Sequence, residues 1–235
     1  MRAGNPRRLL LASLVLAGVL AGPGGTVAGQ SDAATDPRLE QVVGYYTGTS
    51  GTVDDPRAHE LLVEAAADGD VLARMWLARC YSRGRMLFER DEKRAGELAA
   101  EVIDQVSALA EQDSAEASFL MGTAFAEALG VEADLGLAIH WYFRAAGLGN
   151  VLAQHNLGNA YRTGDGVFQD AAMAAYWYRQ AARQGDALTA FWLGEMYERG
   201  EGVSPSREQA LRWYRESADR GNTRGREAVT RLQAR

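Results

Sequence analysis

The chain has 235 residues, and 47% of them are hydrophobic, which is enough for one or two folded domains. Its net charge of −6 excludes a nucleic-acid partner, because phosphate binding needs a basic surface. Cys80 is the single cysteine, so no disulfide can form within the chain. We expect Cys80 to be a small buried apolar side chain; a disulfide to a partner is the alternative.

The N-terminal residues have the layout of a secretory signal peptide. Arg2, Arg7 and Arg8 precede an uncharged apolar run over 9–21, and helix-breaking and small residues follow over 22–29. A membrane-spanning helix needs about 20 apolar residues, so this run is too short for a comfortable span. We predict that 1–29 is a signal peptide, that the mature protein is periplasmic or secreted, and that it has no stable membrane span. Anchoring in the inner membrane by an uncleaved N-terminal segment is the alternative.

The rest of the chain, 30–235, repeats one motif. Its clearest copy reads Ala153, Leu157-Gly158, Tyr161, Gly164, Gly166-Val167, Asp170, Ala174, Trp177-Tyr178, Ala181-Ala182 and Gly185. The same pattern recurs 36 residues earlier and 36 residues later, and weaker copies lie upstream. We assign the units 34–69, 70–113, 114–149, 150–185 and 186–221, followed by a capping helix in 222–235.

Each unit is predicted to form a helix, a short turn and a second helix. In the first unit, Gln41 and Val42 replace the Leu-Gly pair, and the second unit is eight residues longer within 89–112, which predicts a longer second helix there. Small residues let neighbouring helices approach, while Trp177 and Tyr178 fill the remaining space.

Turn and cap residues bound the predicted helices. Gly164 is placed to end a first helix, and Ser206 with Gln209 fits a capping box at the start of a second one. The other predicted helix caps are Asn150, Asp170, Asp186 and Asn222.

This motif resembles the Sel-one-like repeat, a relative of the tetratricopeptide repeat. The resemblance implies an all-α, right-handed α/α superhelix that serves as an adaptor in protein complexes. Cysteine-rich members implicated in β-lactam binding have paired cysteines in each repeat, and this chain lacks them, so that activity is not carried over. Because one helix pair cannot bury its own apolar face, we expect a stacked, open, curved solenoid with an inner wall.

The first helix of each unit is expected to line that inner wall. The positions that we expect to face the groove are Met75, Arg79, Ser82, Phe119, Thr123, Ala126, His155, Asn159, Arg162, Phe191, Glu195 and Glu198. Aromatic side chains together with arginines suit an extended peptide that carries carboxylates. A glycan stacked on the aromatic rings is the alternative.

No catalytic or metal-binding constellation is evident in the sequence. His59, His140 and His155 are scattered, and no serine stands three residues before Lys93, the only lysine. We therefore predict a non-enzymatic exported scaffold, without cofactor or metal, that binds a protein or an extended peptide. The alternative is a peptidoglycan- or polysaccharide-binding modulator of envelope enzymes, and an enzyme is the third and weakest reading.

Overall fold

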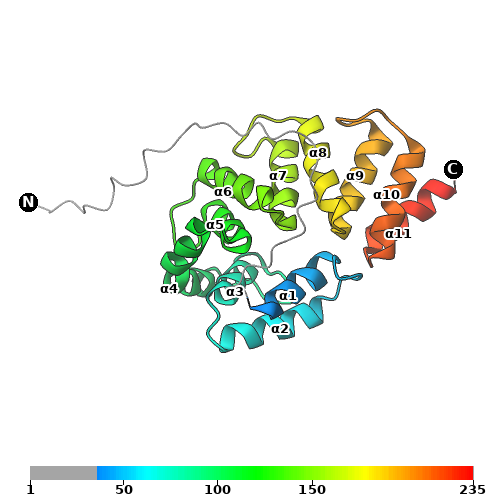
Figure 1. Cartoon of the computed structure of the whole chain (residues 1–235). Coiled ribbons are helices and arrows are strands. Elements are labelled where there is room, and N and C mark those ends of the chain that lie inside the picture. Colours follow the sequence, from blue (N-terminus) through cyan, green and yellow to red (C-terminus); the bar gives the residue numbers. More distant parts are fainter. Residues whose placement is uncertain (1–35, 235) are drawn as a thin grey trace, which may run out of the picture.

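The computed structural model describes residues 36–234, and these residues form eleven α-helices and no strand (Figure 1). The predicted signal peptide lies outside the described residues. The helices are α1 Pro37–Thr47, α2 Asp55–Ala67, α3 Val71–Arg83, α4 Glu92–Glu111, α5 Ala115–Glu127, α6 Leu135–Gly147, α7 Val151–Thr163, α8 Ala171–Arg183, α9 Ala187–Arg199, α10 Arg207–Asp219 and α11 Thr223–Gln233.

The helices pair in the order that the repeat predicts. In each unit the first helix packs on the second, from α1 with α2 to α9 with α10, and each second helix packs on the first helix of the next unit. The last helix, α11, packs on α10. The all-α superhelical repeat fold is therefore confirmed, with a seam of buried side chains running from unit to unit.

Short polar side chains start the helices where the sequence places them. Asn150, Asp186 and Asn222 each accept a hydrogen bond from a backbone N–H in the first turn of α7, α9 or α11. Ser206 Oγ likewise accepts from Gln209 N at 3.2 Å. In a full capping box, the Gln209 side chain would also accept a hydrogen bond from the Ser206 N–H. Here the Ser206 N–H donates to the Tyr197 carbonyl oxygen instead, at 2.8 Å.

The second unit contains the longest helix of the described chain, as predicted. The 20 residues of α4 compare with 13 residues in α6, α8 and α10. Asp91 caps α4 by accepting the Arg94 N–H at 2.9 Å. The added turns keep the buried residues of α4 on one face, from Ala95 to Ala110, so the unit remains in phase.

The glycine of the motif lies directly under the tyrosine ring of the second helix. A Cβ placed at Gly158 would be 2.3 Å from Tyr178 Cδ1, and equivalent close approaches join Gly122 to Tyr142 and Gly194 to Tyr214. Tyr178 is fully buried, whereas Trp177 is only half-buried. The motif therefore depends on a missing side chain in one helix and a ring that fills the space from the other.

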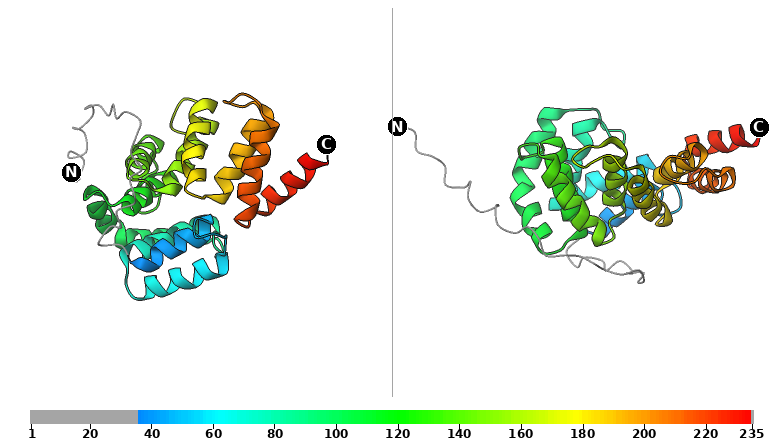
Figure 2. Two further views of the ribbon diagram at one scale, coloured as in Figure 1. Left: turned by 45° about the vertical axis from the view of Figure 1, so that its right-hand side comes forward. Right: turned by 90° about the horizontal axis from the view of Figure 1, so that it is seen from above.

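The solenoid curls until its first and last units touch, so the expected open stack is wrong in this respect. The turn between α1 and α2 lies against the junction of α10 and α11 (Figures 1 and 2). Val53 N donates to the Arg220 carbonyl oxygen at 3.1 Å, and Arg220 Nη1 donates to the Gly48 carbonyl oxygen at 3.3 Å. Curvature accumulated over five units therefore closes the inner wall into a ring with cavities inside.

Candidate functional site

The first helices of the three middle units lie side by side and form an inner wall. Helix α3 packs on α5, and α5 packs on α7, so that these helices form a continuous layer inside the ring. The second helices α4, α6 and α8 lie outside this layer (Figure 1).

A buried arginine lies at the centre of this wall. Arg79, on α3, is only 5% exposed, and its Cζ is 4.5 Å from the Trp76 ring centroid, 5.3 Å from that of Phe119 and 5.5 Å from that of Tyr46. Within the described part of the chain, Nε and Nη1 of Arg79 have no hydrogen-bond acceptor. The aromatic rings stabilise the charge through cation–π contacts but leave these donors free.

Two cavities meet at Arg79. The first, which we call the arginine pocket, has a volume of about 490 Å³ and is lined by Arg79, Arg83, Arg85, Ala126, Glu127, Leu135, Ala138, Ile139, Tyr142, Asn156, Asn159, Ala160 and Asp165. The second, the closure pocket, has a volume of about 340 Å³ and is lined by Tyr46, Thr47, Val53, Asp55, Arg79, Leu152, His155, Asn156, Asp186, Ala187, Leu188, Gly221, Asn222 and Thr223. Arg79 and Asn156 line both cavities, so they lie at the boundary between them.

Glu127 lines the arginine pocket, and its carboxylate is bound by a second arginine, Arg85. Arg85 donates to the Glu127 carboxylate at 2.5 and 3.2 Å, and Ser82 donates to it as well. Burial favours the neutral acid, but the hydrogen bond and charge of Arg85 outweigh burial and lower the pKa of Glu127. Glu127 is therefore an anion at neutral pH whose oxygens are occupied by Arg85 and Ser82.

The closure pocket is lined by more acidic than basic side chains, unlike the arginine pocket. His155 Nδ1 is 3.6 Å from Asp186 Oδ2 and has no hydrogen-bond partner within residues 36–234. Asp186 is 2% exposed and also caps α9 by accepting the Thr189 N–H at 2.6 Å. Burial, together with the nearby Asp54 charge, raises the pKa of Asp55 at the same cavity. The two carboxylates make this cavity a poor place for a further anion.

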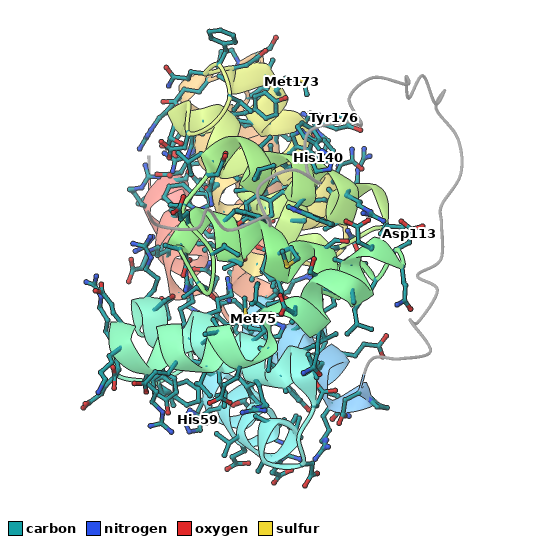
Figure 3. The ribbon with its side chains drawn as sticks, turned by 90° about the vertical axis from the view of Figure 1, so that its left-hand side faces the viewer. His59, Met75, Asp113, His140, Met173 and Tyr176 are labelled. Carbon is teal, nitrogen blue, oxygen red and sulfur yellow. The ribbon has the colours of Figure 1, made fainter. Side chains whose placement is uncertain are left out.

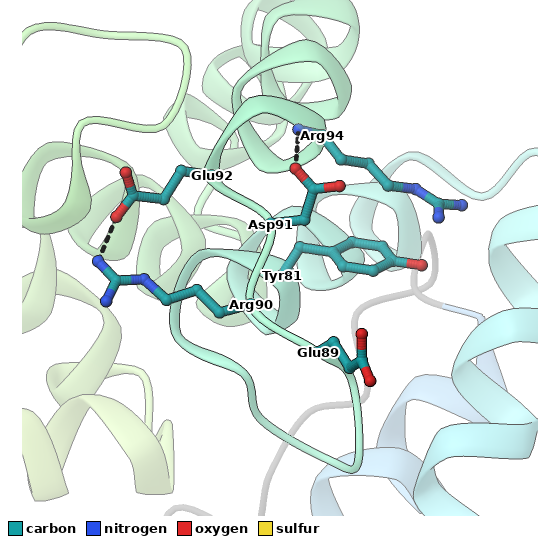
Figure 4. A pocket seen from close by; sticks show the side chains of 6 residues that line it. All are labelled: Tyr81, Glu89, Arg90, Asp91, Glu92 and Arg94. Atoms are coloured by element: carbon teal, nitrogen blue, oxygen red, sulfur yellow. Dashed lines mark hydrogen bonds and ion pairs between the residues drawn. The ribbon is translucent and has the colours of Figure 1, made fainter.

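A third hollow lies outside the ring, at the turn between α3 and α4 (Figure 4). Most of its charged groups have local partners: Arg90 pairs with Glu92, Asp91 caps α4, and the Arg94 guanidinium lies 4.4 Å from the Tyr81 ring centroid. These contacts hold the turn in place and leave the cavities around Arg79 as the stronger candidate site.

Comparison with known proteins identifies the repeat. The family model of the Sel1 repeat matches five stretches, at 42–70, 71–101, 115–150, 151–186 and 187–222, which together cover more than half of the chain. The chain belongs to the Sel1 repeat family. Sel1 repeat proteins are generally protein-interaction scaffolds. No curated protein matches this chain.

Two solved structures are similar to this chain. A Sel1 repeat protein from Oxalobacter formigenes is 35% identical, with a TM-score of 0.56, over 76% of this chain and 50% of that one. The protective antigen c5321 of uropathogenic Escherichia coli is 26% identical, with a TM-score of 0.46, over 83% of this chain and 56% of that one. This Sel1 repeat chain therefore spans about half the length of these two relatives.

Three of the residues that were expected to face the groove lie in the core of the Sel1 repeats instead. Met75, Phe119 and Thr123 are 1%, 0% and 2% exposed. Phe119 packs between Trp76 and Tyr142, with ring centroids 5.7 and 6.1 Å apart. These positions are covered by side chains of α3 and α6, so the predicted aromatic surface at Phe119 does not exist.

Ser82 is also buried, with 7% exposed, and its hydroxyl donates to the Glu127 carboxylate. The other predicted residues divide into two sets. Arg79, His155 and Asn159 line the cavities, together with Ala126. The other set lies on the last two units and lines neither cavity. Arg162 donates to the Tyr178 hydroxyl at 3.0 Å, Phe191 packs 5.6 Å from the Tyr214 ring, Glu195 pairs with Arg199 at 3.1 Å, and Glu198 pairs with Arg231 at 2.6 Å.

Several cavity residues were missed at the sequence level. Asn156 was missed, although it lies three positions before the predicted Asn159 on α7 and therefore shares its helix face. Leu135 and Ile139 come from the second helix α6 and also line the cavity. Only the packing angle between units reveals that contribution.

The histidines and the thiol of this Sel1 repeat protein are held in separate places. His59 stacks on Phe88, with ring centroids 4.1 Å apart, and lies far from His140 (Figure 3). Within residues 36–234, no group of three or more His, Cys, Asp or Glu side chains could hold a metal ion. Burial raises the pKa of the Cys80 thiol to about 11, so Cys80 is a neutral core side chain at neutral pH. None of the helices formed by 36–234 has the length and apolarity to cross a membrane.

Proposed function

We propose that this Sel1 repeat protein is an exported scaffold that holds a partner protein at the cavities around Arg79. The observation that carries the proposal is a cationic, partly apolar cavity on the inner wall, in a family of interaction scaffolds. The groups that line it come from three successive units, so a partner bound there contacts the repeats jointly. Export rests on the signal-like layout of 1–29.

The experiment is site-specific photo-crosslinking in cells. One variant carries a photo-crosslinking amino acid in place of Arg83, whose side chain is 57% exposed at the rim of the arginine pocket. The matched control carries it in place of Arg183, exposed on the outer helix α8. We expect a discrete crosslinked partner protein from the first variant and none from the control. Equal crosslinking from both positions would contradict binding at the inner wall.

Export is tested separately. Fractionation and N-terminal sequencing of the mature protein should give a soluble periplasmic or secreted species that begins near residue 30. A full-length species in the membrane fraction would favour the anchored alternative.

The polysaccharide-binding alternative relied on the aromatic rings of Phe119 and Phe191. It is weaker because Phe119 is buried, while Phe191 packs 5.6 Å from the Tyr214 ring and lines neither cavity. Retention of the protein on purified peptidoglycan, with no crosslinked protein at Arg83, would restore that alternative.

A further inference from the structure

The two ends of the solenoid are joined by a contact that we call the clasp, between the turn 48–54 and the junction 220–222 (Figure 2). Within the described chain, Arg220 takes part in both hydrogen bonds that cross the clasp. Its carbonyl oxygen accepts the Val53 N–H at 3.1 Å, and its Nη1 donates to the Gly48 carbonyl oxygen at 3.3 Å. On the side of α10, Arg220 Nε donates to Glu216 at 2.9 Å, which orients the guanidinium. One residue of the last unit therefore closes the ring.

Arg220 departs from the contact made at the same repeat position one unit earlier. Gln184 holds that position, and its Nε2 donates to the Gly149 carbonyl oxygen of the preceding unit at 3.0 Å. The corresponding glycine for Arg220 is Gly185, but the guanidinium passes over it to reach the first unit. A Cβ placed at Gly185 would be 2.5 Å from Arg220 Nη1. The longer side chain therefore replaces a contact between neighbouring units by a contact between the two ends.

Glycines let the two ends approach closely. Gly48 and Gly221 both have a left-handed backbone, with φ of 85° and 90°. A Cβ at Gly221 would be 3.0 Å from Thr52 Oγ1, and a Cβ at Gly48 would be 3.3 Å from the Ala187 Cβ. A side chain at either position would crowd the facing unit and would strain the backbone. The clasp is therefore a fitted contact between two turns.

The clasp is weaker than the joints between adjacent units. Adjacent units are joined by helices that pack on each other over buried side chains, whereas the clasp joins one turn to another. Val53 and Leu188, which line the closure pocket, remain 37% and 36% exposed, and the Arg220 side chain is 27% exposed. Hydrogen bonds that water reaches and apolar side chains that are only partly covered characterise the parts of a fold that open first.

Opening the clasp needs little change elsewhere in the molecule. The curvature is the sum of small rotations between five units, so a small change at each interface separates the ends while every helix pair stays intact. The closure pocket lies behind the clasp, and its wall includes Val53 from one turn together with Gly221 and Asn222 from the other. Separation of the ends removes that wall and opens the ring to the side.

We propose that the clasp is a gate, which opens so that a segment of a partner protein enters the ring from the side and closes behind that segment, with Arg220 holding it shut. The inference rests on the proposed scaffold function and adds a conformational step to it. Because entry and release both require opening, the gate slows both steps. A bound partner therefore stays longer than its contacts with the inner wall alone would allow.

The first test measures opening without any partner. Spin labels are attached at Arg57→Cys on α2 and Arg224→Cys on α11, both exposed, in a Cys80→Ala background. We expect double electron–electron resonance to show a short and a long distance, and Arg220→Ala to raise the long-distance fraction about fivefold, as the loss of one hydrogen bond implies. The matched control Gln184→Ala removes a contact between neighbouring units and should leave the fractions unchanged. Equal fractions in the wild type and in Arg220→Ala overturn the proposal.

The second test locks the gate. The Val53 Cβ is 4.0 Å from the Cβ position at Gly221, within the range that a disulfide spans, so Val53→Cys with Gly221→Cys should form a disulfide across the clasp. A photo-crosslinking amino acid in place of Arg83 then reports the entry of proteins from an envelope extract. We expect the crosslinked product to be lost in the oxidised protein and to return after reduction. The control Val53→Cys alone cannot lock the ring and should crosslink equally in both states.

The outcomes separate the gate from the scaffold function. Equal crosslinking of the double variant before and after reduction overturns the gate and leaves the scaffold function standing. Failure of the disulfide to form also overturns the gate, because the two ends then do not meet as described. No crosslinking from Arg83 in either state contradicts the scaffold function, and the spin-label distances then decide by themselves whether the clasp opens.

Discussion

Replacing Gly158 by alanine tests the packing that defines the repeat. An added Cβ would lie 2.3 Å from Cδ1 and 2.5 Å from Cε1 of the Tyr178 ring. Ordinary contacts are about 1 Å longer, so either the ring or the helix must move. The ring is fully buried, and its hydroxyl donates to Asn159 Oδ1 at 2.6 Å and accepts from Arg162 Nε at 3.0 Å. Tyr178 therefore has little freedom to move away.

The magnitude follows from two opposing effects. Overpacking a core by one methyl group costs about 1–3 kcal/mol, and we take the upper end because of the short distances. Alanine also stabilises a helix interior by about 1 kcal/mol relative to glycine. The net destabilisation should be about 2 kcal/mol, which lowers the melting temperature by about 4–8 °C for a chain of this size.

The assay is chemical denaturation combined with thermal melting, with Gly96→Ala as the matched control. Gly96 lies within α4, and a Cβ there would meet no atom within 4 Å, so its replacement should stabilise the protein by about 0.5–1 kcal/mol. In a Tyr178→Leu background, the cost of Gly158→Ala should shrink. If Gly158→Ala stabilises the wild-type protein as much as Gly96→Ala does, the packing argument is wrong.

Three further results are expected. Glu127→Gln should destabilise the fold by about 2 kcal/mol at neutral pH. Because the folded-state pKa of Glu127 is lowered, the stabilisation by its carboxylate is present above pH 4.5 and disappears as the pH falls through the folded-state pKa. The difference in unfolding free energy between the variant and the wild type should therefore narrow in acid. Cys80 should react with a thiol reagent at neutral pH only after unfolding, because burial raises its pKa to about 11. Tyr178→Ala should lower the free energy of unfolding by about 3–5 kcal/mol, and Trp177→Ala by less, since Trp177 is half-buried.

Each of these results has an outcome that contradicts its basis. A Glu127→Gln effect that is equal at neutral and acid pH would mean that the carboxylate charge does not stabilise the fold. Rapid labelling of Cys80 in the folded protein would show that its unit opens. A larger loss from Trp177→Ala than from Tyr178→Ala would reverse the roles that the structure gives to the two rings.

Local features of the fold were predictable because they depend on neighbouring residues in the chain. The caps at Asn150, Asp186 and Asn222 were each placed correctly, and so was the longer helix α4. Even the degenerate first unit keeps the logic of the motif: Val42 and Leu62, both fully buried, occupy the positions of the glycine and the tyrosine. A larger side chain on the first helix is matched there by a smaller one on the second.

The candidate site was predictable only in part, because burial inside the ring depends on curvature. Arg79, His155 and Asn159 were placed on the inner wall by repeat position alone, and all three line the cavities. Phe119 has the same repeat position as His155, yet it is fully buried between Trp76 and Tyr142. Repeat position gives the direction of a side chain, and the neighbouring units decide whether solvent reaches it.

The sequence by itself determined the helices, their pairing and the register of the five units, since each is set by contacts within a unit or between adjacent units. The tertiary structure decided that the ends of the solenoid meet, where Val53 contacts Arg220, and that Nε and Nη1 of the buried Arg79 find no acceptor among the described residues at the boundary of two cavities. These features depend on small rotations between units that add up over the whole chain, and no single repeat encodes their sum.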